Sequence, residues 1–154
     1  TLSSSSAASD VYKRQTMGSV PPLNHIPRTK RGVVSYSAND IADRLNARAI
    51  VTFTTSGDTA RRVARLHPDL PLLVFTPVQQ VRSQLAMTWG AETFLCEEVN
   101  STDDMIKVVD RQLLAMEQYK EGDTMVVVAG TPPGVAGTTN TIHVHQLGED
   151  TRNP

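Results

Sequence analysis

The sequence predicts an α/β fold in which a five-stranded sheet, parallel except for its last strand, lies between layers of helices. Four short apolar runs, at residues 49–53, 70–75, 91–95 and 124–129, alternate with segments of helical periodicity. Continuous apolar runs are typical of strands covered on both faces, and crossover helices between strands favour parallel pairing. A fifth run, at residues 141–147, follows the fourth with no helix between them. We therefore expect it to be antiparallel and to lie at an edge of the sheet.

The first predicted helix spans residues 35–46, with Ser37 or Asn39 as its cap. Its apolar face comes from residues at positions i, i+3, i+4 and i+7, namely Ala38, Ile41, Ala42 and Leu45. A helix of this pattern packs one face on the sheet.

Three more helices are predicted from residues that typically begin and end helices. The second begins after the Ser56-Gly57 turn and ends before Pro68. The third begins with a Thr76 cap followed by Pro77 and ends at Gly90. The fourth begins at Ser101, a cap residue with an acidic residue three positions on.

The last predicted strand alternates apolar residues with histidines. We expect Ile142, Val144 and Leu147 to lie on its covered face and His143 and His145 on its wet face. Its free edge is a candidate for pairing with a second copy of the chain.

Length and composition indicate one globular domain. The chain has 154 residues, of which 39% are hydrophobic and 20% charged, with a net charge of −1. This charge gives no general attraction to nucleic acid or to anionic membranes. The single cysteine, Cys96, agrees with a reducing compartment, so we expect a cytoplasmic protein. No apolar run approaches the ~18 residues of a membrane span.

Four parts of the chain differ in composition. Residues 1–15 are rich in Ser and Ala and look like adapter-derived, non-native sequence, which implies a truncated gene. Residues 16–31 contain three prolines and are predicted to be a linker. Residues 32–150 form the predicted domain, and residues 151–154 a short tail.

Two loops after apolar strands are rich in groups that bind anions. The first carries Thr54, Thr55, Ser56, Gly57 and Thr59, and the second carries Gly134, Gly137 and Thr138. In an open α/β sheet, ligands lie outside the carboxyl ends of the strands, so both loops are expected at one edge. Glycine permits close backbone approach, and hydroxyls and N–H groups donate to phosphate oxygens. Simple turns with local Ser/Thr capping explain the same residues, and that alternative stays open.

Motifs for chemistry are missing. The sequence has no G-x-x-x-x-G-K-[ST] and no G-x-G-x-x-G after a strand. His143 and His145 have no third metal ligand at a motif spacing. We therefore predict no catalytic residue and no metal ligand in this chain.

Several segments, taken together and in order, are similar to the C-terminal domain of pyruvate kinases, and most similar to the actinobacterial type. They are His25–Arg31, Ala49–Gly57, Ser83–Gly90, Ser101–Asp104, Gly122-Asp123 and Gly137–Thr141. The resemblance runs from about residue 20 to residue 150.

The resemblance implies a three-layer α/β/α domain with a five-stranded mixed sheet. It also implies a role in allosteric control and homotetramer assembly of a glycolytic enzyme. That enzyme transfers a phosphoryl group from phosphoenolpyruvate to ADP, with magnesium and usually potassium. Its active site lies in a (β/α)8 barrel that precedes this domain and has no counterpart here. The fragment is therefore expected to hold no cofactor and to be inactive alone.

The resemblance also implies an effector site in the first loop, where the family pattern is Thr-Lys-Ser-Gly-Arg-Ser. Thr54, Ser56, Gly57 and Thr59 fit this pattern, whereas the Lys and Arg positions hold Thr55 and Asp58. Residues 97–107 lack the Trp and Arg that meet a second phosphate in eukaryotic members. The expected effector is therefore a monophosphate, such as a hexose monophosphate or AMP.

Two other functions compete with this one. The chain is either a stand-alone α/β module that binds a phosphorylated metabolite or a small enzyme of flavodoxin-like shape. Genomic sequence upstream of residue 16 would distinguish them, because a barrel-encoding frame is expected only for a pyruvate kinase.

Overall fold

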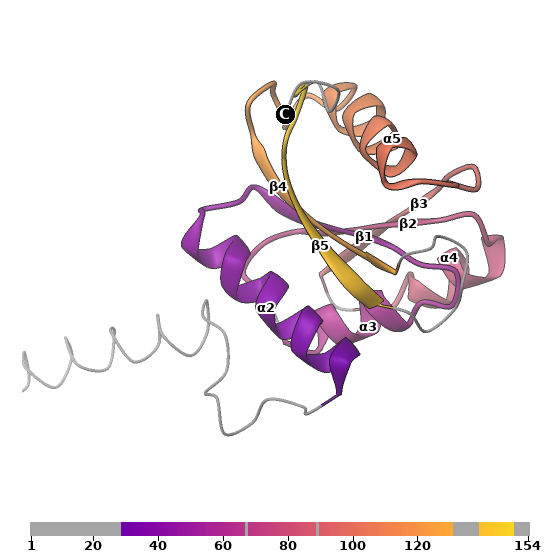
Figure 1. The fold of residues 1–154 in the computed structure, drawn as a ribbon. Coiled ribbons are helices and arrows are strands. Elements are labelled where there is room, and N and C mark those ends of the chain that lie inside the picture. The colour runs from indigo at the N-terminus through magenta and orange to yellow at the C-terminus, as the bar shows by residue number, and fades with distance from the viewer. Residues whose placement is uncertain (1–28, 67, 89, 131–138, 150–154) are drawn as a thin grey trace, which may run out of the picture.

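The computed structural model describes residues 29–66, 68–88, 90–130 and 139–149 (Figure 1). Its elements are, in chain order, α2 (Lys30–Arg44), β1 (Ala49–Phe53), α3 (Asp58–Ala64), β2 (Leu72–Thr76), α4 (Gln79–Leu85), β3 (Ala91–Leu95), α5 (Thr102–Leu114), β4 (Thr124–Gly130) and β5 (Thr139–Gln146).

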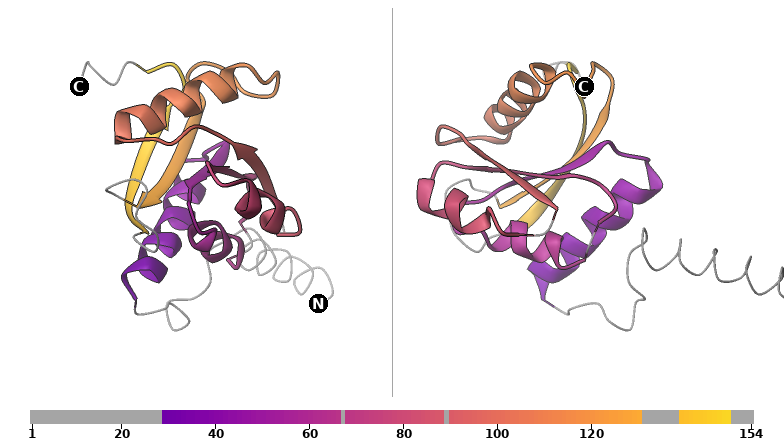
Figure 2. Two further views of the ribbon diagram at one scale, coloured as in Figure 1. Left: turned by 90° about the vertical axis from the view of Figure 1, so that its right-hand side faces the viewer. Right: turned by 180° about the vertical axis from the view of Figure 1, so that it is seen from behind.

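The strands form one sheet in the order β3-β2-β1-β4-β5. All neighbouring pairs are parallel except β4 and β5, which are antiparallel. Helix α5 covers one face of the sheet, and α2, α3 and α4 cover the other (Figures 1 and 2). The predicted α/β fold with an antiparallel last strand is confirmed, with β5 at an edge.

Helix α2 begins earlier than predicted. Its cap is Thr29, whose Oγ1 accepts a hydrogen bond from the Gly32 N–H at 3.1 Å. Asn39, one of the two expected caps, lies inside the helix and donates from Nδ2 to the Ser35 carbonyl. Leu45, expected on the apolar face, follows the end of the helix and is half exposed.

Helix α4 is shorter than predicted at both ends. Thr76 is the last residue of β2, and its Oγ1 accepts from the Val78 N–H at 3.2 Å, so the helix begins only at Gln79. The helix ends at Leu85, and a turn leads to Gly90, which has a φ of 69°. In contrast, α5 begins as predicted, because Ser101 Oγ accepts from the Asp104 N–H.

The expected faces of β5 are wrong for His145 and Val144, whereas Leu147 is buried and Ile142 packs against the core as expected. His145 is buried at 1% exposure, whereas Val144 is 44% exposed. His145 Nε2 lies 2.7 Å from Asp110 Oδ1 on α5, and the Gly148 N–H donates to the same oxygen. A buried histidine is tolerated here because a carboxylate on another element satisfies one of its ring nitrogens.

Candidate phosphate-binding loop

The loop of residues 54–57 leaves the carboxyl end of β1 and enters α3. Thr54 N–H donates to the Phe75 carbonyl at 3.0 Å, which continues the β1–β2 pairing by one residue. The chain then turns at Gly57, whose φ of 90° is in the left-handed region that favours glycine. A Cβ at this position would lie about 3.0 Å from the Arg61 guanidinium. The backbone angle therefore favours glycine, whereas the guanidinium, at the end of a flexible side chain, can shift to make room.

Two hydroxyls of the loop hold its shape. Thr54 Oγ1 accepts from the Gly57 N–H at 2.8 Å, and Ser56 Oγ accepts from the Asp58 N–H at 3.3 Å. Thr54 is buried, whereas Thr55 and Ser56 are half-buried. Thr54 thus positions the turn, and the hydroxyls of Thr55 and Ser56 are the ones accessible to a ligand.

The second predicted loop ends beside the first. The side-chain hydroxyls of Thr59, in the first turn of α3, and Thr139, the first residue of β5, are hydrogen-bonded to each other and buried. Gly134, Gly137 and Thr138 lie outside the described residues. Thr139, which the sequence placed near the end of this loop, is the first residue of β5, and its contact with Thr59 confirms that the described end of the loop lies at the same edge as the first loop.

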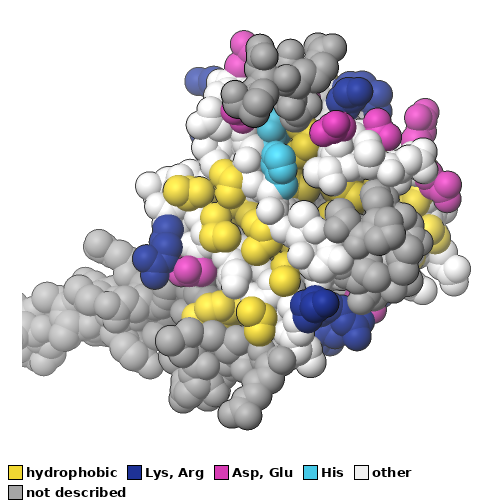
Figure 3. All heavy atoms as spheres, viewed as in Figure 1, with side chains coloured by type: hydrophobic (Ala, Val, Ile, Leu, Met, Phe, Trp, Pro, Cys, Tyr) yellow, Lys and Arg dark blue, Asp and Glu magenta, His cyan; other side chains and the backbone are white. Residues whose placement is uncertain are grey.

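Two arginines lie near the carboxylate of Asp58 at the end of the loop. The Asp58 carboxylate lies 3.7 Å from an Arg61 nitrogen and 4.0 Å from an Arg31 nitrogen. Arg61 also donates to the Ser56 carbonyl at 3.2 Å. Basic side chains gather near α3 and the start of β5 on this face (Figure 3). These arginines partly offset the negative charge that Asp58 brings to the loop.

Sequence reasoning missed the role of Arg61. In the structure Arg61 is partly exposed on α3. The signal that identifies it is its spacing, because positions three and four apart on a helix are neighbours and Arg61 follows Asp58 by three residues.

The geometry offers anion binding rather than catalysis. Burial raises the pKa of the Cys96 thiol, which keeps it protonated at neutral pH and disfavours its use as a nucleophile. The rings of His143 and His145 have centroids 6.0 Å apart. Across the part of the chain that the structure describes, no three His, Cys, Asp or Glu side chains lie close enough to hold a metal ion. In the same part, no helix is both long and apolar enough to cross a membrane.

The fold and this loop together define a three-layer α/β/α domain with a hydroxyl-rich, arginine-flanked loop after its first strand. The family model described as pyruvate kinase, alpha/beta domain, matches residues 33–145. The chain belongs to this family.

Curated relatives give the same result. The chain is 71% identical over 140 residues to pyruvate kinase of Corynebacterium efficiens, a match that covers 91% of this chain and 30% of the relative. It is 64% identical over 130 residues to pyruvate kinase of Mycobacterium tuberculosis, covering 84% of this chain and 28% of the relative. The chain thus spans less than a third of the length of these relatives and corresponds to a C-terminal domain fragment of actinobacterial type.

A solved structure supports the fold. The crystal structure of a pyruvate kinase from Cryptosporidium parvum matches with a TM-score of 0.70 and 21% identity, covering 79% of this chain and 23% of that chain. At this identity the match shows that the two share a fold.

Proposed function

We propose that this domain is the regulatory and oligomerisation part of a pyruvate kinase and that its first loop binds a phosphorylated effector. The observation that carries the proposal is the meeting of accessible hydroxyls, the Gly57 turn and the Arg61 guanidinium at the carboxyl end of β1. The parent enzyme would transfer a phosphoryl group from phosphoenolpyruvate to ADP in the cytoplasm.

The charge of the loop favours one phosphate over two. Thr55 and Ser56 present hydroxyls, and Arg61 offers guanidinium donors that suit a phosphate. Asp58 holds part of this positive charge and repels a second anionic group. A hexose monophosphate or AMP is therefore the proposed class of effector, and Gly134, Gly137 and Thr138 of the second loop remain proposed binding residues.

Magnesium and potassium belong to the parent reaction in this proposal. The described residues of this domain lack a cluster that fits a divalent ion, so no step is assigned to a metal here. The competing function, a stand-alone module that binds a phosphorylated metabolite, uses the same loop. The stand-alone module differs only because it needs no catalytic barrel. Genomic sequence upstream of residue 16 tests this difference, since a barrel-encoding frame is expected only for a pyruvate kinase.

Effector binding is tested by titrating the purified chain with glucose 6-phosphate, AMP, fructose 1,6-bisphosphate and unphosphorylated glucose, followed by calorimetry and thermal melts. We expect a monophosphate to bind and to raise Tm, and glucose to do neither. Ser56→Asp should abolish binding by charge repulsion. Arg61→Gln should weaken it about tenfold, because a charge-assisted hydrogen bond is lost.

A matched control adds the same charge elsewhere. Gln118 is exposed near the amino end of β4, away from the loop, so Gln118→Glu should leave the Tm shift unchanged. Gly57→Val, which the φ of 90° disfavours, should also remove binding. If the ligand-induced shift survives both Ser56→Asp and Gly57→Val, the effector does not bind at this loop.

The oligomerisation half of the proposal places the contact at β5. This strand lies at the edge of the sheet, and apolar side chains gather over α2 and β5 on the same face of the molecule (Figure 3). Val144 is 44% exposed on the edge strand, and Ile142 packs against the core under α2. An edge strand beside an apolar surface is suited to pairing with a second copy.

Sedimentation velocity tests this contact. We expect the chain to self-associate and Val144→Lys to shift it toward the monomer, since a buried charge at a strand edge opposes pairing. Met87 is 93% exposed after α4, so Met87→Lys is the matched control and should leave the distribution unchanged. Equal effects of the two lysines would exclude β5 as the contact.

A further inference from the structure

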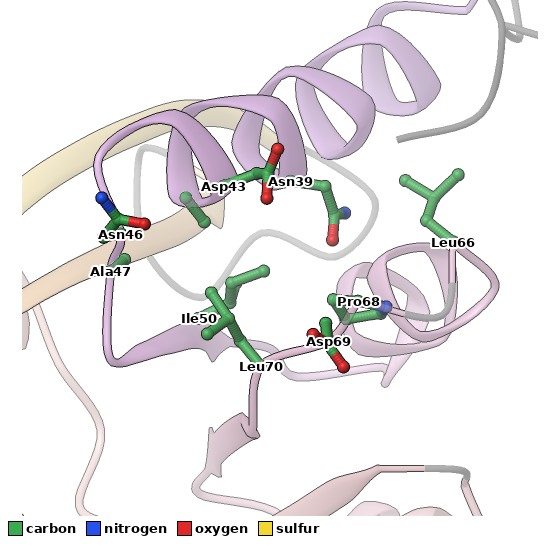
Figure 4. Close-up of a pocket in the computed structure, with 10 residues that line it drawn as sticks. Asn39, Asp43, Asn46, Ala47, Ile50, Leu66, Pro68, Asp69 and Leu70 are labelled. Atoms are coloured by element: carbon green, nitrogen blue, oxygen red, sulfur yellow. The ribbon is translucent and has the colours of Figure 1, made fainter. Parts of the chain in front are cut away.

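A cavity lies at the end of β1 opposite to the loop. It has a volume of about 220 Å³ and is bounded by the C-terminal half of α2, the start of β1, and Leu66 together with Pro68, Asp69 and Leu70 (Figure 4). Pockets for drug-sized ligands are about 300–1,000 Å³, so this one suits a more compact molecule. The cavity is independent of the phosphate-binding proposal, since no residue of the loop lines it.

Asn39 leaves an unpaired acceptor at the cavity. Its side chain is 5% exposed, and Nδ2 donates to the Ser35 carbonyl at 3.0 Å. Its Oδ1 is buried and has no hydrogen-bond partner within the described part of the chain. Figure 4 shows this side chain extending from α2 toward the segment that holds Pro68. A buried carbonyl oxygen without a donor is unfavourable, and a ligand that brings an N–H or O–H would satisfy it.

The charged residues that the structure describes at the cavity are both acidic. Asp43 and Asp69 line it and are both exposed, so their carboxylates lie at its rim. Among the described residues that line it, none is Lys, Arg or His. An anion such as a phosphate would be repelled here, in contrast to the loop at the other end of β1.

The remaining lining is mostly apolar and comes from both sides of the cavity. Its apolar members are Ala42, Ala47, Ile50, Leu66, Pro68 and Leu70. A metal ion does not fit such a lining, and no metal-binding cluster of three groups occurs among the described residues. A matching ligand has an apolar part that fits the apolar lining. It also has one positively charged donor group that suits both the unpaired Asn39 oxygen and the acidic rim.

We propose that this cavity binds a small organic ammonium compound. The ammonium donates a hydrogen bond to Asn39 Oδ1 and lies in the field of Asp43 and Asp69, while the hydrocarbon part packs on Ile50 and the neighbouring alanines. Two carboxylates in one rim favour the cation over a neutral or anionic molecule of equal shape.

Three probes of one shape test the proposal on the full chain: cyclohexylammonium, cyclohexanol and cyclohexanecarboxylate. Binding is followed at low salt by NMR, through the methyl signals of Ala42 and Ala47 and the side-chain amide of Asn39. We expect the ammonium to bind at least about fivefold tighter than cyclohexanol, and the carboxylate not to bind. Perturbations that map elsewhere, or a carboxylate that binds as well as the ammonium, would overturn the proposal.

Variants separate charge from shape. The double change Asp43→Asn and Asp69→Asn should reduce ammonium affinity about fivefold or more and leave cyclohexanol affinity unchanged. Glu98→Gln removes an exposed carboxylate outside the cavity lining and should change neither. Because Asp43 and Asp69 are exposed, their variants are expected to fold. An ammonium affinity equal in the wild type and the double variant would contradict the assignment.

Discussion

The two faces of the sheet are packed with different side chains. Under α5 the core contains large residues, and Phe75 stacks on Phe53 at 5.2 Å and on Phe94 at 5.1 Å between ring centroids. Under α2, α3 and α4 the core contains five buried alanines together with valines and a few larger side chains. One helix and large side chains fill the first face, whereas three helices and small side chains fill the second.

The two faces of the sheet are therefore expected to differ in role: one contributes mainly to stability, and the other carries both proposed sites. Large stacked side chains bury much apolar area under α5 and leave a rigid face. Small side chains let α2 and α3 lie close to the sheet. Their first turns bring Arg31 and Asp58 to the loop, while Asn39 inside α2 and Leu66 just after α3 lie at the cavity. The helices of the second face therefore position residues of the two proposed sites, while α5 contributes mainly to the core.

A pair of matched leucines tests this division. Leu113 on α5 and Leu85 at the end of α4 are both 0% exposed and belong to opposite cores. Leu113→Ala should lower the free energy of unfolding by about 4–5 kcal/mol and Leu85→Ala by about 2–3 kcal/mol, within the range for buried leucines. The smaller loss is expected at Leu85 because α4 has seven residues and its end can relax into the space. Urea denaturation measures both values, and equal losses would remove the distinction between the faces.

A pair of matched alanines tests the cavity. Ala38 and Ala42 are both 0% exposed and lie one turn apart on α2, but only Ala42 lines the cavity. Ala38→Leu should cost about 1–3 kcal/mol, because extra atoms enter a filled core. Ala42→Leu should cost less, since its added atoms have the cavity to enter, and it should also block the cyclohexyl probes. Chemical denaturation gives the costs, and an Ala42→Leu variant that is the less stable of the two would show that the cavity cannot accept a side chain.

The parts of the fold that local signals determine could be predicted from the sequence. β1 and β3 have the predicted bounds, because each is a short apolar run between turn residues. The start of α5 could be predicted because a cap interaction is local. Ser101 Oγ accepts a hydrogen bond from the N–H of Asp104, only three residues further along the chain. The position of the candidate loop after β1 followed from the same kind of signal, an apolar strand followed by a Ser-Gly turn.

Features that depend on distant partners could not be predicted. The partner that buries His145 is Asp110, 35 residues away, so the alternation in β5 alone gave the wrong face. The charge balance at Asp58 depends on Arg31 from another helix. The cavity forms where the C-terminal half of α2 lies near Leu66 and residues 68–70, and no local sequence pattern marks this contact between distant segments.

The weakest effect expected is a pH dependence from His143, on the face of β5 toward α5. Burial lowers the pKa of His143 below its ordinary value, and the nearby His145 lowers it further, while Glu149 and Asp103 oppose the shift. The unfolded chain keeps the ordinary pKa of about 6.5, so it binds more protons than the folded chain as the pH falls. This contribution to stability is therefore complete above pH ~6.5 and is lost as the pH falls through the lowered folded value.

His143→Gln removes that contribution while leaving the other histidines in place. At pH 8 the change should alter the free energy of unfolding by less than about 0.5 kcal/mol, as is usual for a partly exposed site. Between pH 7.5 and pH 5 the variant should lose less stability than the wild type, because it has no imidazole at this position to take up a proton on unfolding. Urea denaturation across this range measures both curves. Parallel curves would mean that His143 is as easily protonated in the folded chain as in the unfolded one, and that the α5 side of β5 does not exclude charge there.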